Sequence, residues 1–331
     1  MKYFSRILIS IAFILVFILA PVACNANNKN DPDNFSGEIN IATLGGTTGF
    51  GMAKLMSDAK NSDSDIKYNV EVQSSAEEIS KALIKGELDI AALPTNAAAN
   101  LHAKTSGGIK ILAVNTLGVL YVVVNENNSN IKSLSDLEGK QVYCPAQNPT
   151  FIFKGLCDKA GVSVVIDNSF STPEELQTAT ISGAADIAVL PEPLVTVVKS
   201  KNKSLTVALD LTAEWDKVFP EGSLMQGCVV ARTSFIEQFP QAVEEFLGDY
   251  KASVNYVNEN PEDAAKLIAD AGIVGNENVA KSAIPNCNIK YVDGKDMAAA
   301  LDIFFDTIYK INPKSVGEKL PDKSIYYNGN S

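Results

Sequence analysis

The chain has 331 residues, 46% hydrophobic and 20% charged, which is long enough for two lobes with separate cores. Its formal net charge is −11 at pH 7, and without its first 24 residues it would hold 26 Lys and Arg against 39 Asp and Glu, about −13. Such an acidic chain argues against nucleic acid as a partner.

The N-terminus has the pattern of an export signal. Two basic residues precede the 14-residue apolar run Ile7–Ala20. A bilayer span needs about 20 residues, so this run fits a secretory signal better than a membrane helix. It leads to Pro21-Val22-Ala23-Cys24, which resembles a bacterial lipoprotein signal, with Pro21 in place of the usual Leu.

This resemblance predicts a lipid-anchored protein outside the cytoplasm. We expect a lipoprotein signal peptide over residues 1–24, with Cys24 as the lipid attachment site on the outer face of the cell membrane. Residues 25–37 are rich in Asn and Asp and predict a flexible tether. Soluble secretion, with cleavage near Ala26, is the alternative.

Strand and loop patterns open each half of the remaining chain. Ile39–Leu44 and Lys140–Cys144 predict strands, and the loops 45–50 and 145–151 lead from them into helices. Each half therefore reads as alternating strands and helices, which predicts an α/β fold with two parallel-type sheets flanked by helices. In such sheets ligands gather beyond the carboxyl ends of the strands.

A helix–strand unit then appears twice, 97 residues apart. Residues 75–94 and 172–191 share 10 identities in 20 aligned positions. In each copy a Ser or Thr with Glu three residues later predicts a capping box, and Gly86 or Gly183 predicts the end of the helix. A short apolar strand follows, and proline ends it. The repeat predicts two lobes of like construction that face each other across a cleft.

Two apolar segments are expected to carry the chain between the lobes. They are Val119–Val124 and Gly227–Ala231, and both predict strands. The predicted division has residues 38–121 with 230–331 as a discontinuous lobe 1 and residues 122–229 as lobe 2.

The last hundred residues predict amphipathic helices. They cover Pro240–Val257, a segment beginning at Asn260-Pro261, and Asp296–Tyr309. Because they follow the return to lobe 1, their apolar faces should pack on that lobe.

Two α/β lobes joined by two strands behind such a leader resemble a known family. The chain is similar to the type II periplasmic-type binding proteins of the nitrate/sulfonate/thiamine-precursor branch, the substrate-binding lipoproteins of ABC transporters. The most particular marks are Gly-x-x-Asp-Ile-Ala at 86–91, Thr116-Leu117-Gly118-Val119-Leu120-Tyr121, Leu190-Pro191-Glu192-Pro193 and Glu214-Trp215. The resemblance covers nearly all of the chain after the leader. It implies a two-lobed monomer that closes on one small solute and delivers it to a membrane permease.

Loops on the expected cleft side supply the candidate ligand-binding residues. A Gly-rich loop before a helix could hold an electronegative group with its N–H groups, and Asn148 is expected to be an N-cap with Pro149 as the first helical residue. An indole in the cleft could stack on a flat ligand, or it could belong to the core of a lobe. The candidates are Gly46, Thr47, Thr48, Phe50, Thr95, Asn96, Asn115, Thr116, Gln147, Asn148, Thr150, Phe151, Glu192 and Trp215.

The scarcity of arginine bears on the nature of the solute. Arg6 and Arg232 are the only arginines, Arg6 leaves with the leader, and none of the candidate loops carries Arg or Lys. Arginine is the usual clamp for sulfonate, carboxylate or phosphate. Aromatic, amide, hydroxyl and carboxylate groups favour a flat heterocycle such as a pyrimidine thiamine precursor. A sulfonate, nitrate or other small anion is the alternative.

A secreted enzyme of the same fold, related to thiamine-pyrimidine synthesis, is the second alternative. His102 is the only histidine, and no cysteine cluster or nucleophile elbow accompanies it. We therefore expect no enzyme, no metal site and no cofactor. Pairing of Cys228 with Cys287, or of Cys144 with Cys157, stays open.

Overall fold

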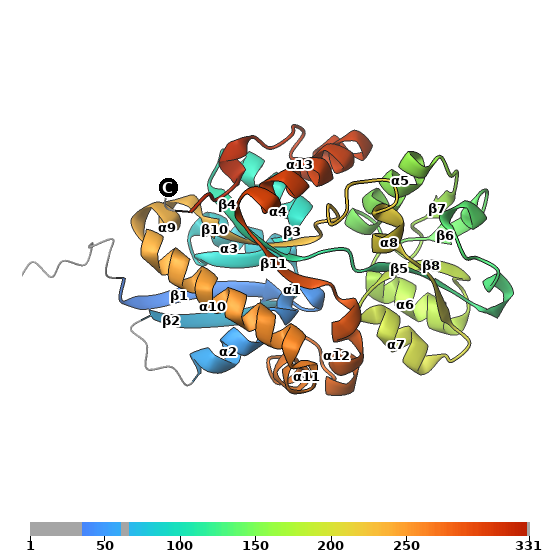
Figure 1. Ribbon diagram of the computed structural model, residues 1–331, viewed down its shortest axis with the longest axis horizontal. Helices are drawn as coiled ribbons and strands as arrows, with labels where there is room; N and C mark the ends of the chain where they lie inside the picture. The colour runs from blue at the N-terminus through green and yellow to red at the C-terminus, as the bar shows by residue number, and fades with distance from the viewer. Residues whose placement is uncertain (1–34, 61–65, 330–331) are drawn as a thin grey trace, which may run out of the picture.

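The computed structural model describes residues 35–60 and 66–329, and it is an α/β protein built on two sheets (Figure 1). The expected signal peptide and Cys24 lie outside the described residues, as does most of the expected tether. Within the described ranges, no helix is both long and apolar enough to cross a membrane.

The first sheet has six strands in the order β11-β4-β10-β3-β1-β2. Strand β1 pairs in parallel with β2 and β3, whereas β10 runs antiparallel to both β3 and β4. The strands are β1 (Gly37–Leu44), β2 (Ile66–Gln73), β3 (Ile90–Pro94), β4 (Ile109–Thr116), β10 (Gly227–Arg232) and β11 (Ile289–Val292).

The second sheet has five strands in the order β7-β6-β8-β5-β9. Strand β6 pairs in parallel with β7 and β8, and β5 runs antiparallel to β8 and β9. The strands are β5 (Leu120–Val124), β6 (Gln141–Tyr143), β7 (Val165–Asp167), β8 (Ile187–Pro191) and β9 (Thr206–Asp210). We call the parts of the chain built on the first and second sheets lobe 1 and lobe 2.

The predicted repeat occupies the centre of each lobe. Strands β3 and β8 both end in proline, and each lies between a parallel neighbour and an antiparallel strand that has just arrived from the other lobe. The helices before them end at Gly86 and Gly183, with φ of 75° and 80°, the left-handed region that glycine adopts at low cost. The predicted α/β fold is confirmed, although each sheet is mixed rather than purely parallel.

The capping boxes differ between the two copies. Thr172 and Glu175 form the full reciprocal box. Ser75 accepts hydrogen bonds from the N–H groups of Glu77 and Glu78, but the Glu78 carboxylate accepts from Ser74 Oγ, so the box there is half formed.

The chain changes sheets within short connecting segments. Strand β5 lies entirely in the second sheet and β10 entirely in the first, so the changes fall at residues 117–119 and 211–226. The sequence placed them inside these two strands. The division into lobes of 38–121 with 230–331, and of 122–229, stays a prediction.

Helices cover the sheets of both lobes (Figure 1). Those of lobe 1 are α1 (Thr47–Phe50), α2 (Ala53–Ala59), α3 (Ala76–Lys85), α4 (Thr95–Lys104), α9 (Thr233–Gln238), α10 (Pro240–Glu259), α11 (Pro261–Asp270), α12 (Glu277–Ala283) and α13 (Gly294–Ile311). Those of lobe 2 are α5 (Asn148–Ala160), α6 (Pro173–Ser182), α7 (Leu194–Lys201) and α8 (Leu211–Trp215). Short 3-10 helices are η1 (Glu126–Asn128), η2 (Leu134–Leu137), η3 (Ile284–Asn286), η4 (Pro313–Val316) and η5 (Lys323–Ile325).

The C-terminal helices do not all pack where the sequence placed them. The apolar face of α10 is buried against β1, α1 and α2 of lobe 1, as expected. Helix α13 instead joins a core cluster that continues into lobe 2, where Phe304 and Phe305 belong with Phe153. A Cβ added to Gly155 of α5 would stand 3.2 Å from Cγ2 of Thr307, so the two helices touch closely. The glycine makes this approach between the lobes feasible.

Candidate functional site

Two cavities take residues from both lobes, and the first of them includes the carboxyl ends of β1, β2 and β8. The first has a volume of about 630 Å³, and we call it the Glu192 cavity. Its walls are mostly aliphatic, and it contains two carboxylates and no lysine or arginine. It is lined by Leu44, Gly45, Gly46, Thr47, Val72, Gln73, Ser74, Pro173, Glu174, Pro191, Glu192, Pro193, Leu194, Val197, Ile273, Val274 and Val279.

The second cavity, of about 670 Å³, lies along α3 and α4, and we call it the α4 cavity. Lobe 2 contributes only the start of α5 to it, and η4 closes one side. It is lined by Ala76, Glu77, Ser80, Lys81, Ile84, Asn96, Ala97, Asn100, Leu101, Lys104, Gln147, Phe151, Asn312, Lys314 and Ser315.

Six of the fourteen residues predicted from the sequence line these cavities. Gly46, Thr47 and Glu192 line the first. Asn96, Gln147 and Phe151 line the second. The other eight line neither, and they are Thr48, Phe50, Thr95, Asn115, Thr116, Asn148, Thr150 and Trp215.

The Gly-rich loop after β1 reaches the Glu192 cavity because its backbone turns sharply. Gly46 has φ of 78° and its N–H donates to the carbonyl of Ile273 at 3.0 Å. A Cβ on Gly49 would stand 2.4 Å from the carbonyl oxygen of Leu44, so only glycine permits this turn. Helix α1 has four residues, and its Phe50 side chain is buried in the core. Thr47 is the residue of α1 that lines the cavity.

Two predicted polar residues hold this loop from behind. The side chain of Asn115 is buried and donates through Nδ2 to the carbonyl of Thr48 at 3.1 Å. Its Oδ1 accepts from the hydroxyl of Thr116 at 3.0 Å. Both residues therefore position the loop. Thr95, the first residue of α4, is buried.

Glu192 is a buried acid at the start of α7. Its side chain is 4% exposed and its carboxylate accepts hydrogen bonds from the N–H and the hydroxyl of Thr196, both at 3.1 Å. Burial raises the pKa of Glu192 above the ordinary value of 4.5, against the opposing effects of Thr196 and Lys199. The side chain thus caps a helix and also borders the cavity.

The start of α5 differs from the prediction. Gln147, with φ of 66°, is the N-cap, and Asn148 is the first helical residue, so Pro149 occupies the second position. Proline fits either position, and the left-handed backbone at Gln147 shifts the helix start by one residue. Thr150 lines neither cavity, and its hydroxyl donates to the carbonyl of Pro145 at 2.7 Å.

Trp215 and Phe50, two of the three aromatic candidates, belong to the core. Neither has exposed surface. The indole of Trp215 stacks on Phe219 with ring centres 4.0 Å apart, and its N–H donates to Ser223 Oγ at 2.9 Å. Trp215 therefore belongs to the core of a lobe, which was the alternative interpretation of this residue. Its indole has no exposed face on which a ligand could stack.

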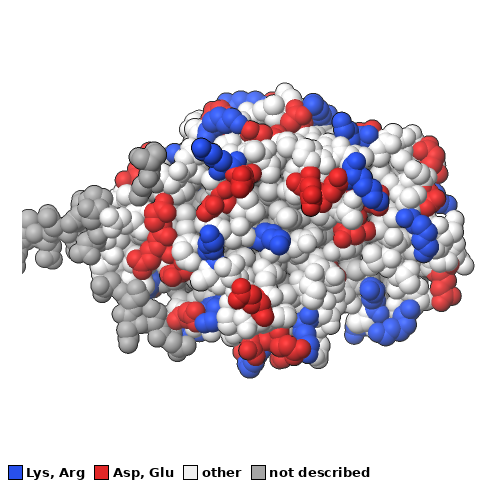
Figure 2. All heavy atoms as spheres, viewed as in Figure 1, with Lys and Arg blue, Asp and Glu red and all other residues white. Residues whose placement is uncertain are grey.

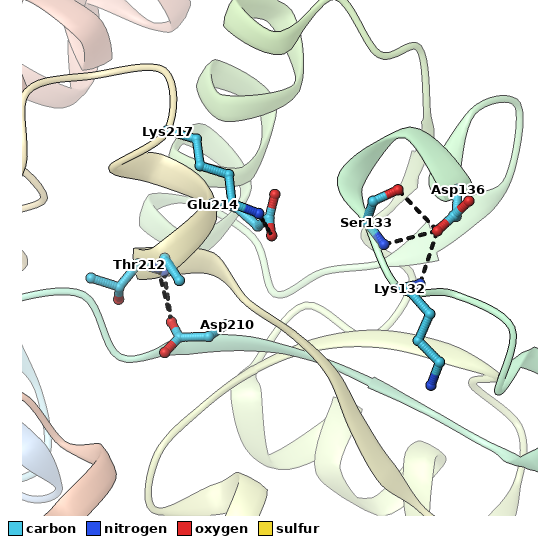
Figure 3. Close-up of polar contacts among 8 residues, drawn as sticks. Lys132, Ser133, Asp136, Asp210, Thr212, Glu214 and Lys217 are labelled. Carbon is cyan, nitrogen blue, oxygen red and sulfur yellow. Dashed lines mark hydrogen bonds and ion pairs between the residues drawn. The ribbon is translucent and has the colours of Figure 1, made fainter.

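Local capping explains why Trp215 is buried. Asp210 accepts hydrogen bonds from the N–H groups of Thr212 and Ala213 and so starts the short helix α8 (Figure 3). Glu214, whose side chain is 11% exposed, pairs with Lys217 at 2.6 Å. The indole of the next residue in α8 lies in the core.

The remaining arginine, Arg232, lines neither cavity. Arg232 pairs with Asp89 at 2.6 Å, and its Nε donates to the carbonyl of Leu88 at 2.8 Å. These contacts tie the end of β10 to the turn before β3, so the guanidinium is used in the fold. Over the face shown in Figure 2, basic and acidic side chains are interspersed.

The sequence missed several cavity residues. Gln73 is the last residue of β2 and Ser74 follows it, and the sequence analysis did not place this strand at particular residues. Glu77 and Glu174 occupy the same position of the repeat, and each lines one cavity. The alignment of the two copies could therefore have predicted Glu77 and Glu174 as a matched pair of carboxylates in the cleft. The lysines of the α4 cavity lie in helices, whereas the residues predicted from the sequence come mainly from loops.

Groups that often carry chemistry are tied into the fold. His102 is 6% exposed, and its Nδ1 lies 2.7 Å from the carbonyl oxygen of Ile109. Cys144, Cys157, Cys228 and Cys287 are buried and unpaired. Across residues 35–60 and 66–329, no cluster of three or more potential metal-ligating side chains occurs.

A family model described as NMT1/THI5 like matches residues 45–264. The chain belongs to this family. No curated protein sequence gives a significant match. Membership of the family confirms the resemblance drawn from the sequence.

Solved structures show the same fold. An ABC transporter protein from Parabacteroides distasonis superposes with a TM-score of 0.75 at 24% identity, covering 88% of this chain and 98% of that one. The periplasmic aliphatic sulphonate binding protein SsuA from Escherichia coli gives 0.72 at 16% identity, covering 88% and 92%. A protein from Candida albicans, described as having the generic periplasmic binding protein fold, gives 0.58 at 13% identity, covering 89% and 97%. This NMT1/THI5-like chain therefore has the periplasmic binding protein fold.

Proposed function

We propose that the chain is the extracytoplasmic solute-binding component of an ABC importer. The observation that carries this proposal is that both cavities are built from residues of two lobes, which only two connecting segments join covalently. A change in the angle between the lobes would open or close both cavities at once. Membership of the NMT1/THI5-like family and the fold shared with ABC transporter proteins support the same role.

Small-angle scattering of purified protein, with solute found by mass spectrometry of the released ligand, tests this proposal. We expect a small molecule to leave the protein on mild denaturation, and its return to reduce the radius of gyration. A solute that binds without altering the scattering would contradict closure of the lobes.

We propose that the solute is rich in N–H donors, as a pyrimidine thiamine precursor is. The Glu192 cavity presents hydrogen-bond acceptors, including the carboxylates of Glu174 and Glu192 and the buried Oε1 of Gln73, which has no partner among the described residues. A cavity with acceptors and no cationic side chain favours donors over anions. The aliphatic walls do not support the expected stacking on aromatic rings.

Titration of the protein with pyrimidines and with alkanesulfonates separates this solute from the anion alternative. Glu192→Gln should weaken binding of the N–H-bearing solute by about tenfold, because a charged acceptor of a hydrogen bond is lost. The Thr196→Val variant, which removes only the hydroxyl partner of Glu192, is the matched control. Tighter binding of a sulfonate than of any pyrimidine would favour the alternative.

We infer that Cys24 anchors the protein to the outer face of the cell membrane, from which it would meet its permease as a monomer. The sequence pattern around Cys24 supports this inference. The mass of the mature N-terminus tests it, since diacylation adds two fatty acyl chains. A water-soluble product that begins after Ala26 would contradict the anchor.

We propose binding rather than catalysis as the function of the cleft. His102, the only histidine of the sequence, has its ring nitrogens against the carbonyl oxygen of Ile109 and the hydroxyl of Ser324, and it lines neither cavity. Recovery of a candidate solute unchanged after long incubation with the protein would support this reading. Conversion of the solute would contradict it.

A further inference from the structure

The α4 cavity presents polar groups from one face of a helix. Asn96, Asn100 and Lys104 are spaced four residues apart, so their side chains lie above one another along α4. The Nδ2 of Asn100 donates to the carbonyl of Lys314 at 2.9 Å, which fixes η4 against this face. The cavity is therefore a built space between two tied elements.

Two amide oxygens in this cavity lack donors. The side chain of Asn96 is 9% exposed, and its Oδ1 is buried with no hydrogen-bond partner among the residues described. The Oδ1 of Asn100 is in the same state. A buried acceptor without a donor is costly, so these oxygens favour a ligand with a hydroxyl or an amide N–H.

The charge of the α4 cavity is opposite to that of the Glu192 cavity. Lys81 is paired with Glu77 at 2.7 Å. Lys81 and, more weakly, Lys104 lower the pKa of Glu77, but neither Lys104 nor Lys314 forms an ion pair within 4.0 Å in the described part of the chain. Although the protein has a net charge of −11, these two lysines give the cavity a local positive potential that attracts anions.

The opposite wall completes the site. Gln147, the N-cap of α5, makes no capping hydrogen bond with its side chain, so the first turn of this 13-residue helix directs uncapped N–H groups and its positive dipole toward the cleft. Ala76, Ala97 and Phe151 add apolar surface. The cavity thus combines cations, acceptors and an apolar wall.

We propose that the α4 cavity binds a small organic anion that carries a hydroxyl or amide donor. The anionic group lies between Lys104 and Lys314, and the donor bonds to Oδ1 of Asn96. This site is separate from the Glu192 cavity and does not depend on the solute proposed there.

Calorimetric titration with two matched pairs of probes tests the site. L-malate and succinate differ by one hydroxyl, glycerol 3-phosphate and propyl phosphate differ by two, and the pairs distinguish a carboxylate from a phosphate. We expect the hydroxylated member of one pair to bind at least about tenfold more tightly than its partner, because a donor meets an otherwise unpaired acceptor. Absence of this preference in both pairs would overturn the proposal, as would binding of none of the probes.

Substitutions in the α4 cavity test whether the preferred probe binds there. Lys104→Gln with Lys314→Gln should weaken the preferred probe by about tenfold or more, whereas Lys203→Gln with Lys290→Gln, two exposed lysines elsewhere, should not. Asn96→Leu should abolish the preference for the hydroxyl. If Asn96→Leu fails to fold, the surface lysine variants still decide the question. Equal losses in both lysine pairs would mean general attraction of anions and would contradict a site.

Glu192→Gln separates this proposal from the function proposed above. It should change the affinity for the probe by less than about twofold, since the carboxylate lies in the other cavity. A larger loss would show that the probe occupies the Glu192 cavity and would reject the site at α4.

Discussion

The hydroxyl of Tyr121 on β5 donates a hydrogen bond to the carbonyl of Asn286 at 2.7 Å and so ties lobe 2 to the C-terminal part of lobe 1. A second contact lies beside it, where Nδ2 of Asn288 donates to the carbonyl of Gly118 at 2.6 Å. The lobes are thus held near the first connecting segment by bonds that are not part of either sheet. Residues 286–288 therefore link the lobes by hydrogen bonds, in addition to the two covalent connections.

Tyr121→Phe should destabilise the protein by about 1 kcal/mol, because it removes one partner of a largely buried hydrogen bond. Urea unfolding measures the loss. Tyr309→Phe is the matched control, since the Tyr309 hydroxyl makes no hydrogen bond to another described residue. Equal stability of the two variants would mean that the contact with Asn286 contributes nothing.

Trp215→Ala should destabilise the fold by roughly 3–5 kcal/mol, because it empties a fully buried site beside Phe219. Thermal unfolding measures this loss. The milder Trp215→Phe keeps most of the volume but leaves Ser223 without its indole donor. If either variant unfolds like the parent and yet loses solute, Trp215 contacts the ligand and its burial changes when the lobes open.

Glu192→Gln should change how stability depends on pH. Burial raises the pKa of Glu192 in the folded state above its value of about 4.5 in the unfolded chain, so the folded protein binds this proton more tightly. Its contribution to stability is present below the unfolded pKa and is lost as the pH rises through the folded pKa. Relative to the Gln variant, the parent should therefore lose stability as the pH rises from about 4 through the folded pKa of Glu192.

Chemical unfolding at a series of pH values measures this difference. Glu174→Gln is the matched control, since it removes a carboxylate that is exposed on the rim of the same cavity. A difference between parent and Glu192→Gln that stays constant over this range would contradict the raised pKa.

Gly118→Ala should destabilise the first connecting segment. A Cβ there would stand 2.1 Å from Oγ1 of Thr212 and 2.6 Å from Cδ2 of Leu224, both in the second connecting segment. Overpacking of this kind costs about 1–3 kcal/mol. Thermal unfolding checks the loss, and Gly248→Ala, where an added Cβ meets nothing within 4 Å, is the control. Similar behaviour of the two variants would show that the connecting segments move apart at little cost.

Local chemistry made much of the fold predictable. The repeat at 75–94 and 172–191 gave the helix ends at Gly86 and Gly183 and the two central strands correctly, because capping and left-handed glycine act over a few neighbouring residues. The start of α5 was one residue off, because nothing in the sequence around Gln147 shows that its φ is positive. A non-glycine residue takes that conformation only when the surrounding structure holds it there.

The candidate site was less predictable than the fold. Loop positions identified Gly46, Asn96 and Glu192, which do line a cavity. The same reasoning also chose Asn115, which is buried behind the loop that it supports. Lys104 and Lys314 were not predicted, because they are 210 positions apart in the sequence. Only the packing of η4 on α4 brings them to one cavity.

The sequence by itself determined the α/β class, the duplicated unit and the family to which the chain belongs, since these depend on short-range patterns of apolar, capping and turn residues. Only the tertiary structure decided that Trp215 is core, that α13 reaches lobe 2 and that acceptors and cations gather in separate cavities. The physical reason is that burial and the meeting of distant charges depend on which surfaces pack together. That choice is made by the whole chain at once rather than by any local segment.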